Sequence, residues 1–174
     1  PALSTGVPVV PNEAVFPVYH YKAASGSWFG DINGPLYHDN WFHAFFQWRM
    51  PANPKMCWGH ARSRDLIHWE HLPVAIAPRG SSGSWSGATA VTTAGPRILF
   101  TSDYQQSGAT GNDDLIHWAP MKKEPAMPRS LHESKGIKIG GWRDPFVWKH
   151  NGIYYSCVGG SSEGKGYILS LIHI

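Results

Sequence analysis

The sequence predicts an all-β fold, a β-propeller of which these 174 residues hold about three blades. Three observations support this prediction. Glycine and proline, 19 and 14 of the residues, interrupt the chain about every ten positions, and short aromatic or β-branched runs lie between them. One five-residue segment recurs about 50 residues later, which is a spacing typical of propeller blades. Convincing amphipathic helices are absent from the pattern.

The repeated segment, Asp-Leu-Ile-His-Trp, occupies residues 65–69 and again residues 114–118. Five identical consecutive residues are very unlikely to recur by chance. We interpret the two copies as equivalent positions in two successive blades. Their aspartates are expected to accept local backbone hydrogen bonds at strand ends, and their histidines are expected to pack between blades.

Three hairpins can be placed in chain order. The first has an Asp-Asn turn and the second turns near Ala94-Gly95. The third has an Asn-Gly turn, which is the strongest short signal for a hairpin. The predicted strand pairs are residues 36–38 with 41–48, residues 88–92 with 97–101, and residues 145–150 with 153–158.

The hairpins and the repeat together predict three blades, the last of them incomplete. Three blades cannot close a ring, and their unpaired edges would invite aggregation. We therefore expect either a fragment or a protein that continues past Ile174, and we favour the fragment. The predicted organisation is a lead-in segment at residues 1–27 and a partial propeller at residues 28–174, with blades at about residues 28–80, 81–135 and 140–174.

Composition argues against several classes of protein. The net charge is only +3 and the basic residues are scattered, so a nucleic-acid partner is not expected. No apolar run approaches the length of a membrane span. The ten histidines form no metal-ligand motif, so neither a metal nor another cofactor is expected. Cys57 and Cys157 can pair or stay free, but they do not make a disulfide framework.

Nine tryptophans raise the expectation of a carbohydrate partner, because aromatic faces stack on the apolar faces of sugar rings. A chemical site follows from the blade symmetry. Asp31, the Trp85-Ser86 pair and Asp144 each lie seven to nine residues before the turn of their predicted hairpin. Rotation about the propeller axis brings equivalent positions together, so two carboxylates are expected to meet at the axis. Paired carboxylates are what glycoside hydrolysis needs.

The residues around these positions resemble glycoside hydrolase family 32, the invertases, inulinases and levanases. Residues 28–35 resemble the W-M-N-D-P-N-G box of that family. The resemblance runs from about residue 17 to residue 160 and implies a five-bladed propeller. Four further motifs follow in the family's order: F-Y-Q at residues 45–47, W-G-H…D-L-x-x-W at residues 58–69, W-S-G at residues 85–87, and R-D-P at residues 143–145.

The resemblance implies a retaining double displacement on terminal β-fructofuranosyl bonds, as in sucrose, inulin or levan. Asp31 would be the nucleophile that forms a covalent fructosyl-enzyme. Asp144 would be its partner carboxylate, which binds fructose hydroxyls and stabilises the transition state. The implied substrate contacts are hydrogen bonds from Arg143, Asn33, Gln47 and Ser86, and pocket walls formed by Trp58 and Trp85.

The chain departs from the family pattern in two respects. Gly30 and Ile32 stand where the box has Asn and Pro, so one hydrogen-bonding side chain is missing beside the nucleophile. The family's general acid is a Glu followed by Cys, well beyond the R-D-P motif. Glu163 has no following Cys and is not expected to be that acid. Such an acid contributes about 10²–10⁴-fold, so the segment alone is expected to be inactive.

Two other functions stay open at this point. A fructosyltransferase would use the same site with a sugar hydroxyl in place of water. A catalytically inactive propeller that only binds sugar would fit Gly30 and the missing acid. The related five-bladed arabinanases and xylosidases fit less well, because they lack the W-x-x-D-x-N-G box. The resemblance also implies an extracellular or vacuolar location.

Overall fold

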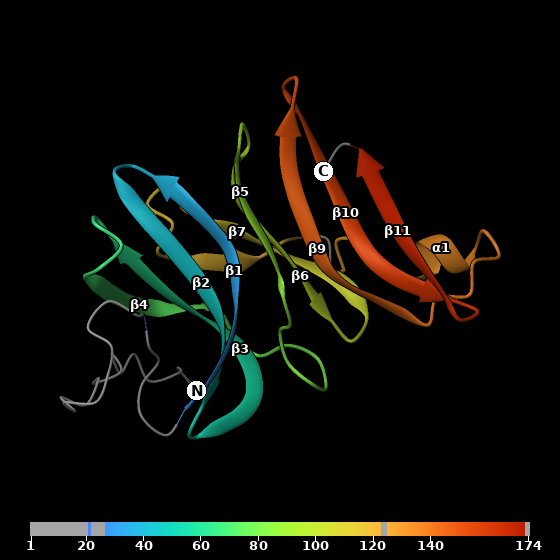
Figure 1. The fold of residues 1–174 in the computed structure, drawn as a ribbon, viewed down its shortest axis with the longest axis horizontal. Helices are drawn as coiled ribbons and strands as arrows, with labels where there is room; N and C mark the ends of the chain where they lie inside the picture. Colours follow the sequence, from blue (N-terminus) through green and yellow to red (C-terminus); the bar gives the residue numbers. More distant parts are fainter. Residues whose placement is uncertain (1–20, 22–26, 123–124, 173–174) are drawn as a thin grey trace.

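The computed structural model describes residue 21, residues 27–122 and residues 125–172. Within these residues the chain forms eleven strands in three antiparallel sheets and one short helix (Figure 1). The predicted lead-in segment lies outside the described residues except for Tyr21 and Ser27.

Each sheet is a meander in which consecutive strands are neighbours. The helix is α1 (Ser130–Glu133), between the second and third sheets. The first sheet holds β1 (Trp28–His38), β2 (Trp41–Met50), β3 (Asn53–Ser63) and β4 (Trp69–Ile76); the second holds β5 (Gly87–Thr92), β6 (Gly95–Ser102), β7 (Gln105–Gly111) and β8 (Trp118–Pro120); the third holds β9 (Gly141–His150), β10 (Ile153–Ser162) and β11 (Lys165–Ile172).

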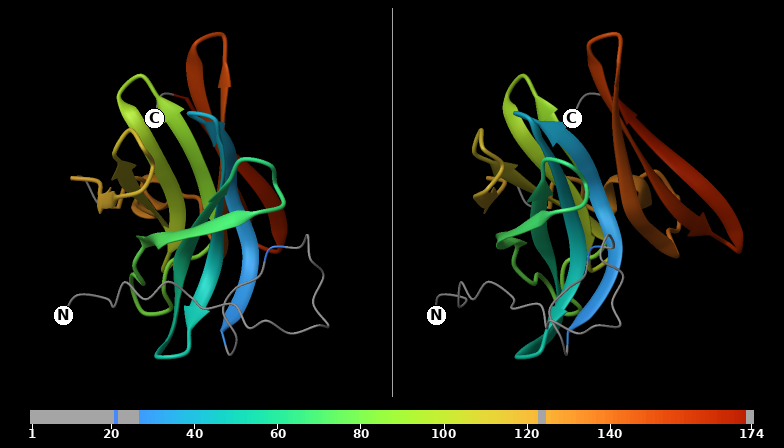
Figure 2. Two further views of the ribbon diagram at one scale, coloured as in Figure 1. Left: turned by 90° about the vertical axis from the view of Figure 1, so that its left-hand side faces the viewer. Right: turned by 60° about the vertical axis from the view of Figure 1, so that its left-hand side comes forward.

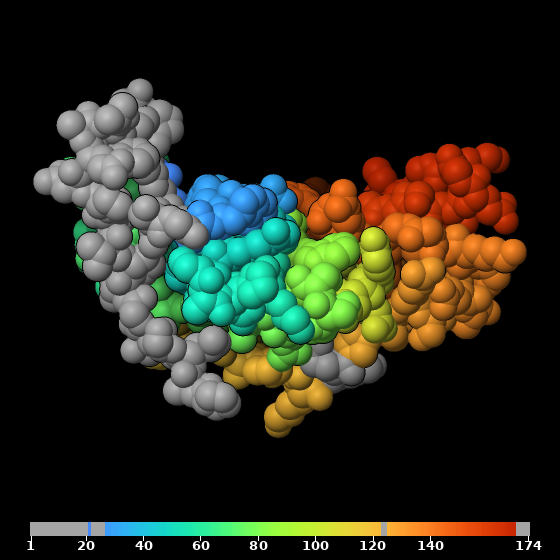
Figure 3. Space-filling view, turned by 90° about the horizontal axis from the view of Figure 1, so that it is seen from below, coloured from blue at the N-terminus to red at the C-terminus, as the bar shows by residue number. Residues whose placement is uncertain are grey.

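The first strands of the three sheets lie next to one another. Strand β5 contacts both β1 and β9, and Figure 1 shows the three near the middle of the molecule with β4 and β11 towards its two sides. Seen from below, the sheets follow one another in chain order (Figure 3). The turn between β9 and β10 reaches the highest point of both views in Figure 2. The arrangement confirms the all-β fold class and agrees with a partial propeller.

Tight turns join the strands. Both residues of the Asp39-Asn40 turn have a positive φ, 47° and 62°, as do both residues of Asn151-Gly152, 48° and 80°. These are the values of hairpin turns whose twist matches that of the flanking strands, and Asn, Asp and Gly tolerate them best. The predicted first and third hairpins are confirmed. The second turns at residues 93–94, between the paired Thr92 and Gly95.

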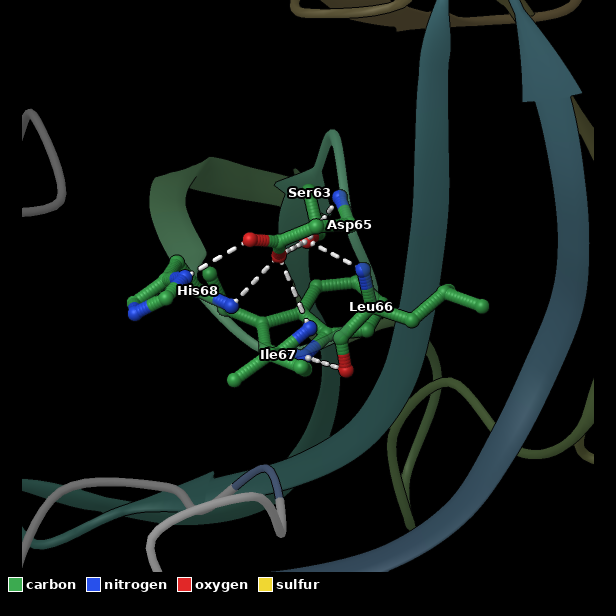
Figure 4. A network of polar contacts seen from close by, with 6 residues as sticks. Ser63, Asp65, Leu66, Ile67 and His68 are labelled. Carbon is green, nitrogen blue, oxygen red and sulfur yellow. Dashed lines mark hydrogen bonds and ion pairs between the residues drawn. The ribbon is translucent and has the colours of Figure 1, made fainter.

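The repeated segment folds into the same turn twice, at the entry to β4 and to β8. Asp65 Oδ1 accepts the backbone N–H groups of Ile67 and His68 at 2.9 and 2.7 Å (Figure 4), and Asp114 Oδ1 accepts that of Ile116 at 2.8 Å. The leucine after each aspartate takes a left-handed conformation, with φ of 64° and 61°. The expected local role of the two aspartates is confirmed.

The two histidines of the repeat do not pack between blades, so that expectation was wrong. The His68 side chain is 86% exposed and its Nδ1 lies 2.7 Å from Asp65 Oδ2. This hydrogen bond is the main reason why the pKa of Asp65 lies well below its usual range. His117 is also exposed. Because the turn projects its histidine away from the sheet, the ring meets solvent rather than a neighbouring blade.

The core consists of apolar seams. One seam joins the first sheet to the second, and another joins the second to the third. Trp58 and Trp142, one in each seam, have no exposed surface. The first seam is formed by Phe45, Trp58, Ala75, Ile76, Ile98, Phe100 and Ala109, and the second by Leu99, Met127, Ile139, Trp142 and Val158.

A pair of histidines is buried inside the first sheet. His43 Nδ1 and His60 Nε2 lie 3.0 Å apart, with 3% and 1% of each residue exposed. The His60 ring also stacks on Phe45, with centroids 4.0 Å apart. Burial lowers the pKa of His43 to about 4, and Arg62 and His38 add to the effect while Asp114 opposes it. Burial also holds the pKa of His60 well below its usual value.

We expect this pair to make the fold sensitive to acid. An unfolded histidine takes up its proton near pH 6.5. Below that pH the unfolded chain binds protons that buried His43 does not bind, so the free energy of unfolding falls as the pH drops towards about 4. The expected loss is about 3 kcal/mol. Urea unfolding of the protein at a series of pH values measures it.

The test variant replaces the titrating ring of His43 with a neutral amide, and the control makes the same change at an exposed histidine. His43→Gln should unfold with a weaker pH dependence between pH 6.5 and 4 than the wild-type protein, and His117→Gln, at an exposed histidine, should keep the wild-type dependence. Parallel pH curves for wild type and His43→Gln would show that the buried pair carries no acid sensitivity.

Candidate active site

The first candidate carboxylate lies at an irregularity of β1. Phe29 pairs with Trp48 and Ile32 pairs with Phe46, so Gly30 and Asp31 together face the single residue Gln47. This is a β-bulge, in which one strand carries an extra residue and a side chain is turned out of the regular alternation. Asp31 is exposed there.

Asp31 is joined to two buried polar side chains. The Ser86 hydroxyl, just before β5, donates to Asp31 Oδ2 at 2.5 Å, and Gln47 Nε2 of β2 donates to Ser86 Oγ at 2.6 Å. The shorter distance is typical of a hydroxyl that donates to an ionised carboxylate. Gln47 and Ser86 are only 7% and 9% exposed. The first two sheets therefore meet at the Asp31 carboxylate.

Gly30 has no room for a side chain. A Cβ atom at this position would collide with the Trp28 indole and come within 2.8 Å of Gln47 Oε1. The space that an asparagine side chain would need is therefore taken by a half-exposed tryptophan and by the glutamine amide. This chain thus has glycine where the family box has asparagine, and the side chains of Trp28 and Gln47 occupy the space beside that glycine.

The second carboxylate also lies at a bulge. Arg143 pairs with Gly159 and Phe146 with Cys157, so Asp144 and its neighbour Pro145 face one residue of β10. Asp144 has a φ of 61°, which costs about 1–2 kcal/mol for a residue with a side chain. Such backbone strain clusters at functional sites.

Asp144 is held by the second sheet and by its neighbour. Its backbone N–H donates to Thr101 Oγ1 of β6 at 3.0 Å. Arg143 Nε lies 3.3 Å from Asp144 Oδ2. Burial raises the pKa of Asp144, the negative charge of Asp31 raises it further, and the Arg143 guanidinium opposes both. The effect of Asp31 means that the two carboxylates interact, although 113 positions separate them along the chain.

Open space adjoins the second carboxylate. A hollow of about 300 Å³ is lined by Arg143 and Asp144 together with small residues of β9 and β10, namely Gly141, Gly159, Gly160 and Ser161. Glu163 instead lies at the exposed turn after β10 and lines a different hollow, with Arg129 and Glu133. The carboxylate of Asp144 and the guanidinium of Arg143 are thus accessible to a ligand with hydroxyl groups.

Two of the residues expected at the pocket lie in the interior instead. Trp58 is fully buried, and its Nε1 donates to the Trp85 carbonyl at 2.7 Å. Asn33 is 2% exposed, and its Oδ1 accepts the Gly87 N–H at 3.4 Å. Both side chains connect the first sheet to the start of β5. Packing between the sheets encloses them, and their contact with a substrate stays a prediction.

Trp85 keeps part of its surface. Its ring meets Tyr104 edge to face, with centroids 5.1 Å apart, and Tyr104 is 42% exposed. Tyr104 and Thr101 were missed by the sequence analysis. No local motif marks Thr101, since it contacts Asp144 from another sheet, and Tyr104 is only a turn residue in the sequence. The aromatic pair presents a partly exposed apolar surface next in sequence to Ser86.

The described part of the chain shows no cluster of three or more His, Cys, Asp or Glu residues that could hold a metal ion. Both cysteines are free thiols, Cys57 buried and Cys157 partly buried. None of its helices is long and apolar enough to cross a membrane. The chemistry available at the site is that of two interacting carboxylates, one guanidinium and a neutral hydrogen-bond relay.

Comparisons with known proteins identify the family of this chain. Residues 20–171 match the family model described as "Glycosyl hydrolases family 32 N-terminal domain". Beta-fructofuranosidase 1 of Zea mays is 40% identical over 143 residues, and the match covers 73% of this chain and 21% of the relative. The cell wall isozyme of beta-fructofuranosidase from Zea mays is 33% identical over 188 residues, covering 93% of this chain and 31% of that relative.

Among solved structures, a variant of fructan 1-exohydrolase IIa from Cichorium intybus in complex with 1-kestose superposes with a TM-score of 0.72 and 29% identity. It covers 88% of this chain, whereas this chain covers 31% of the exohydrolase. The chain thus spans at most about a third of the length of these relatives. On the strength of the family match over residues 20–171, the chain belongs to glycosyl hydrolases family 32, and these residues belong to its N-terminal domain.

Proposed function

We propose that this chain belongs to a glycosidase that releases fructose from terminal β-fructofuranosyl bonds with retention of configuration. The observation that carries the proposal is the pair of carboxylates, Asp31 and Asp144, which lie at bulges of two first strands and interact electrostatically. The names of the relatives, two β-fructofuranosidases and a fructan exohydrolase, support the same substrate class.

In the proposed mechanism Asp31 attacks the anomeric carbon of the fructosyl group. The bond from that carbon to the leaving oxygen breaks as the ester bond to Asp31 forms, and a general acid donates a proton to the departing oxygen. Water then attacks the anomeric carbon, the bond from that carbon to Asp31 breaks and frees the carboxylate, and the same acid group, now a base, takes the proton of the water. Glu163 lines a separate hollow, so we assign the acid to a carboxyl group outside these 174 residues.

Asp144 and Arg143 would bind the fructosyl group during this displacement. Positive charge develops on the sugar ring as the leaving group departs, and a nearby carboxylate stabilises it. The Arg143 guanidinium would orient Asp144 and donate to sugar hydroxyls with charge-assisted hydrogen bonds. Trp85, with Tyr104 beside it, would supply the apolar surface on which a sugar ring can rest.

No feature of the described residues favours a sugar acceptor over water, so hydrolysis is proposed rather than fructosyl transfer. We also propose that the protein acts outside the cytosol, in the extracellular space or the vacuole. One of the relatives is named a cell wall isozyme, which supports this location.

The nucleophile can be tested by replacing Asp31 with asparagine in the full-length protein. Asp31→Asn keeps the size of the side chain but removes the attacking carboxylate, so fructose release from sucrose and inulin should fall by at least about 10⁴-fold. The assay measures free fructose. Near-normal turnover by the variant would rule out Asp31 as the nucleophile.

Asp144 is tested in the same assay. Asp144→Asn retains the hydrogen-bonding shape but removes the charge that stabilises the sugar cation, so kcat/KM should fall by about 10²–10³-fold. Asp114→Asn is the matched control, because Asp114 bonds only local backbone in the repeat turn; it should keep kcat/KM near the wild-type value. Equal effects of the two changes would contradict the role of Asp144.

A further inference from the structure

Gln47 and Ser86 form a hydrogen-bond chain whose direction is fixed by chemistry. An ionised carboxylate only accepts hydrogen bonds, so the Ser86 hydroxyl must donate its one proton to Asp31. Ser86 Oγ is then left as an acceptor, and the Gln47 amide must turn its NH₂ group towards it. Each member of the chain therefore has one possible orientation.

The chain of bonds differs from what the family resemblance implies for these two residues. The only proton of Ser86 is committed to Asp31, so this hydroxyl has none to donate to a sugar. Gln47 is 7% exposed and its NH₂ group is engaged with Ser86. The hydrogen bonds of both side chains thus lead to the candidate nucleophile rather than to the open side of the site.

The bulge and Gly30 make room for this arrangement. Because Gly30 and Asp31 both face Gln47, the glutamine side chain lies beside the candidate nucleophile. A side chain on Gly30 would come within 2.8 Å of Gln47 Oε1 at its first carbon. The absence of that carbon lets the amide lie where it reaches Ser86. The unusual glycine of the box and the Gln47–Ser86 bond therefore belong to one structural unit.

We infer that Gln47 and Ser86 are positioning residues that hold Asp31 Oδ2 in one orientation and leave Oδ1 to attack the sugar. Because Ser86 is anchored in turn by Gln47, the orientation is set from the interior of the fold. This inference rests on the proposed function, since it assigns Asp31 the role of nucleophile.

The test compares kcat and KM of full-length variants with sucrose. Ser86→Ala removes the donor that orients Asp31 Oδ2, so kcat should fall by about tenfold while KM stays within about twofold of the wild-type value. Ser86→Thr keeps the hydroxyl and should restore the wild-type kcat.

Gln47→Glu is the sharpest variant, because it is isosteric. An ionised Glu cannot donate to Ser86 and would instead accept the Ser86 proton, so kcat should fall as it does in Ser86→Ala, again with little change in KM. Ser84→Ala is the matched control. Ser84 is a buried serine two residues away whose hydroxyl donates to the Ala77 carbonyl at 2.9 Å, and its loss should leave kcat unchanged.

Two results would overturn the inference: a rise in KM with an unchanged kcat in Ser86→Ala, which would mark a substrate contact, or an equal fall of kcat in Ser84→Ala. A wild-type protein with no fructosidase activity would instead refute the proposed function. In that case crystal structures of the full-length wild type and Ser86→Ala decide the positioning role. The inference expects one Asp31 orientation in the wild type and more than one in the variant, and unchanged orientations would overturn it.

Discussion

The seam between the first and second sheets is the constraint on which the candidate site depends. Trp58 is fully enclosed there, between phenylalanines of both sheets, and its indole N–H donates to the Trp85 carbonyl at 2.7 Å. Trp85 directly precedes Ser86, whose hydroxyl donates to Asp31. Burial of a large aromatic side chain contributes about 2–3 kcal/mol, whereas one hydrogen bond adds about 1 kcal/mol. Packing of Trp58 therefore determines where Ser86 meets the carboxylate.

The same local feature sets the direction of both candidate carboxylates: a β-bulge, which is an extra residue in the first strand of a sheet. A regular strand alternates its side chains strictly between two faces, and a bulge interrupts this alternation. At Asp144 the conformation is left-handed and costs free energy. The hydrogen bond from its N–H to Thr101, together with the enclosed Trp142 two residues earlier, offsets that cost and keeps the carboxyl in place.

A comparison of the two copies of the Asp-Leu-Ile-His-Trp segment distinguishes what the local sequence determines from what packing between the sheets determines. Both copies form a similar turn, in which the aspartate accepts the backbone N–H two residues on and the leucine is left-handed. Leu66 is nevertheless 52% exposed, while Leu115 is completely buried. The second copy rests on the first sheet, where His38 Nε2 lies 2.8 Å from the Asp113 carbonyl and Trp118 meets Phe45 edge to face. No described sheet covers the first copy in this way.

The sequence by itself determined the all-β class, the turns at Asp39-Asn40 and Asn151-Gly152, and the equivalent positions of Asp31 and Asp144. These features arise from residues close together in the chain or from the symmetry of a repeat. Only the tertiary structure placed Asn33 and Trp58 in the interior and joined Gln47 to Asp31 through Ser86. The alternation of a strand assigns side chains to its two faces. Whether a face meets another sheet or open space depends on how the sheets pack, and that packing joins residues too far apart in the chain for any local pattern to record.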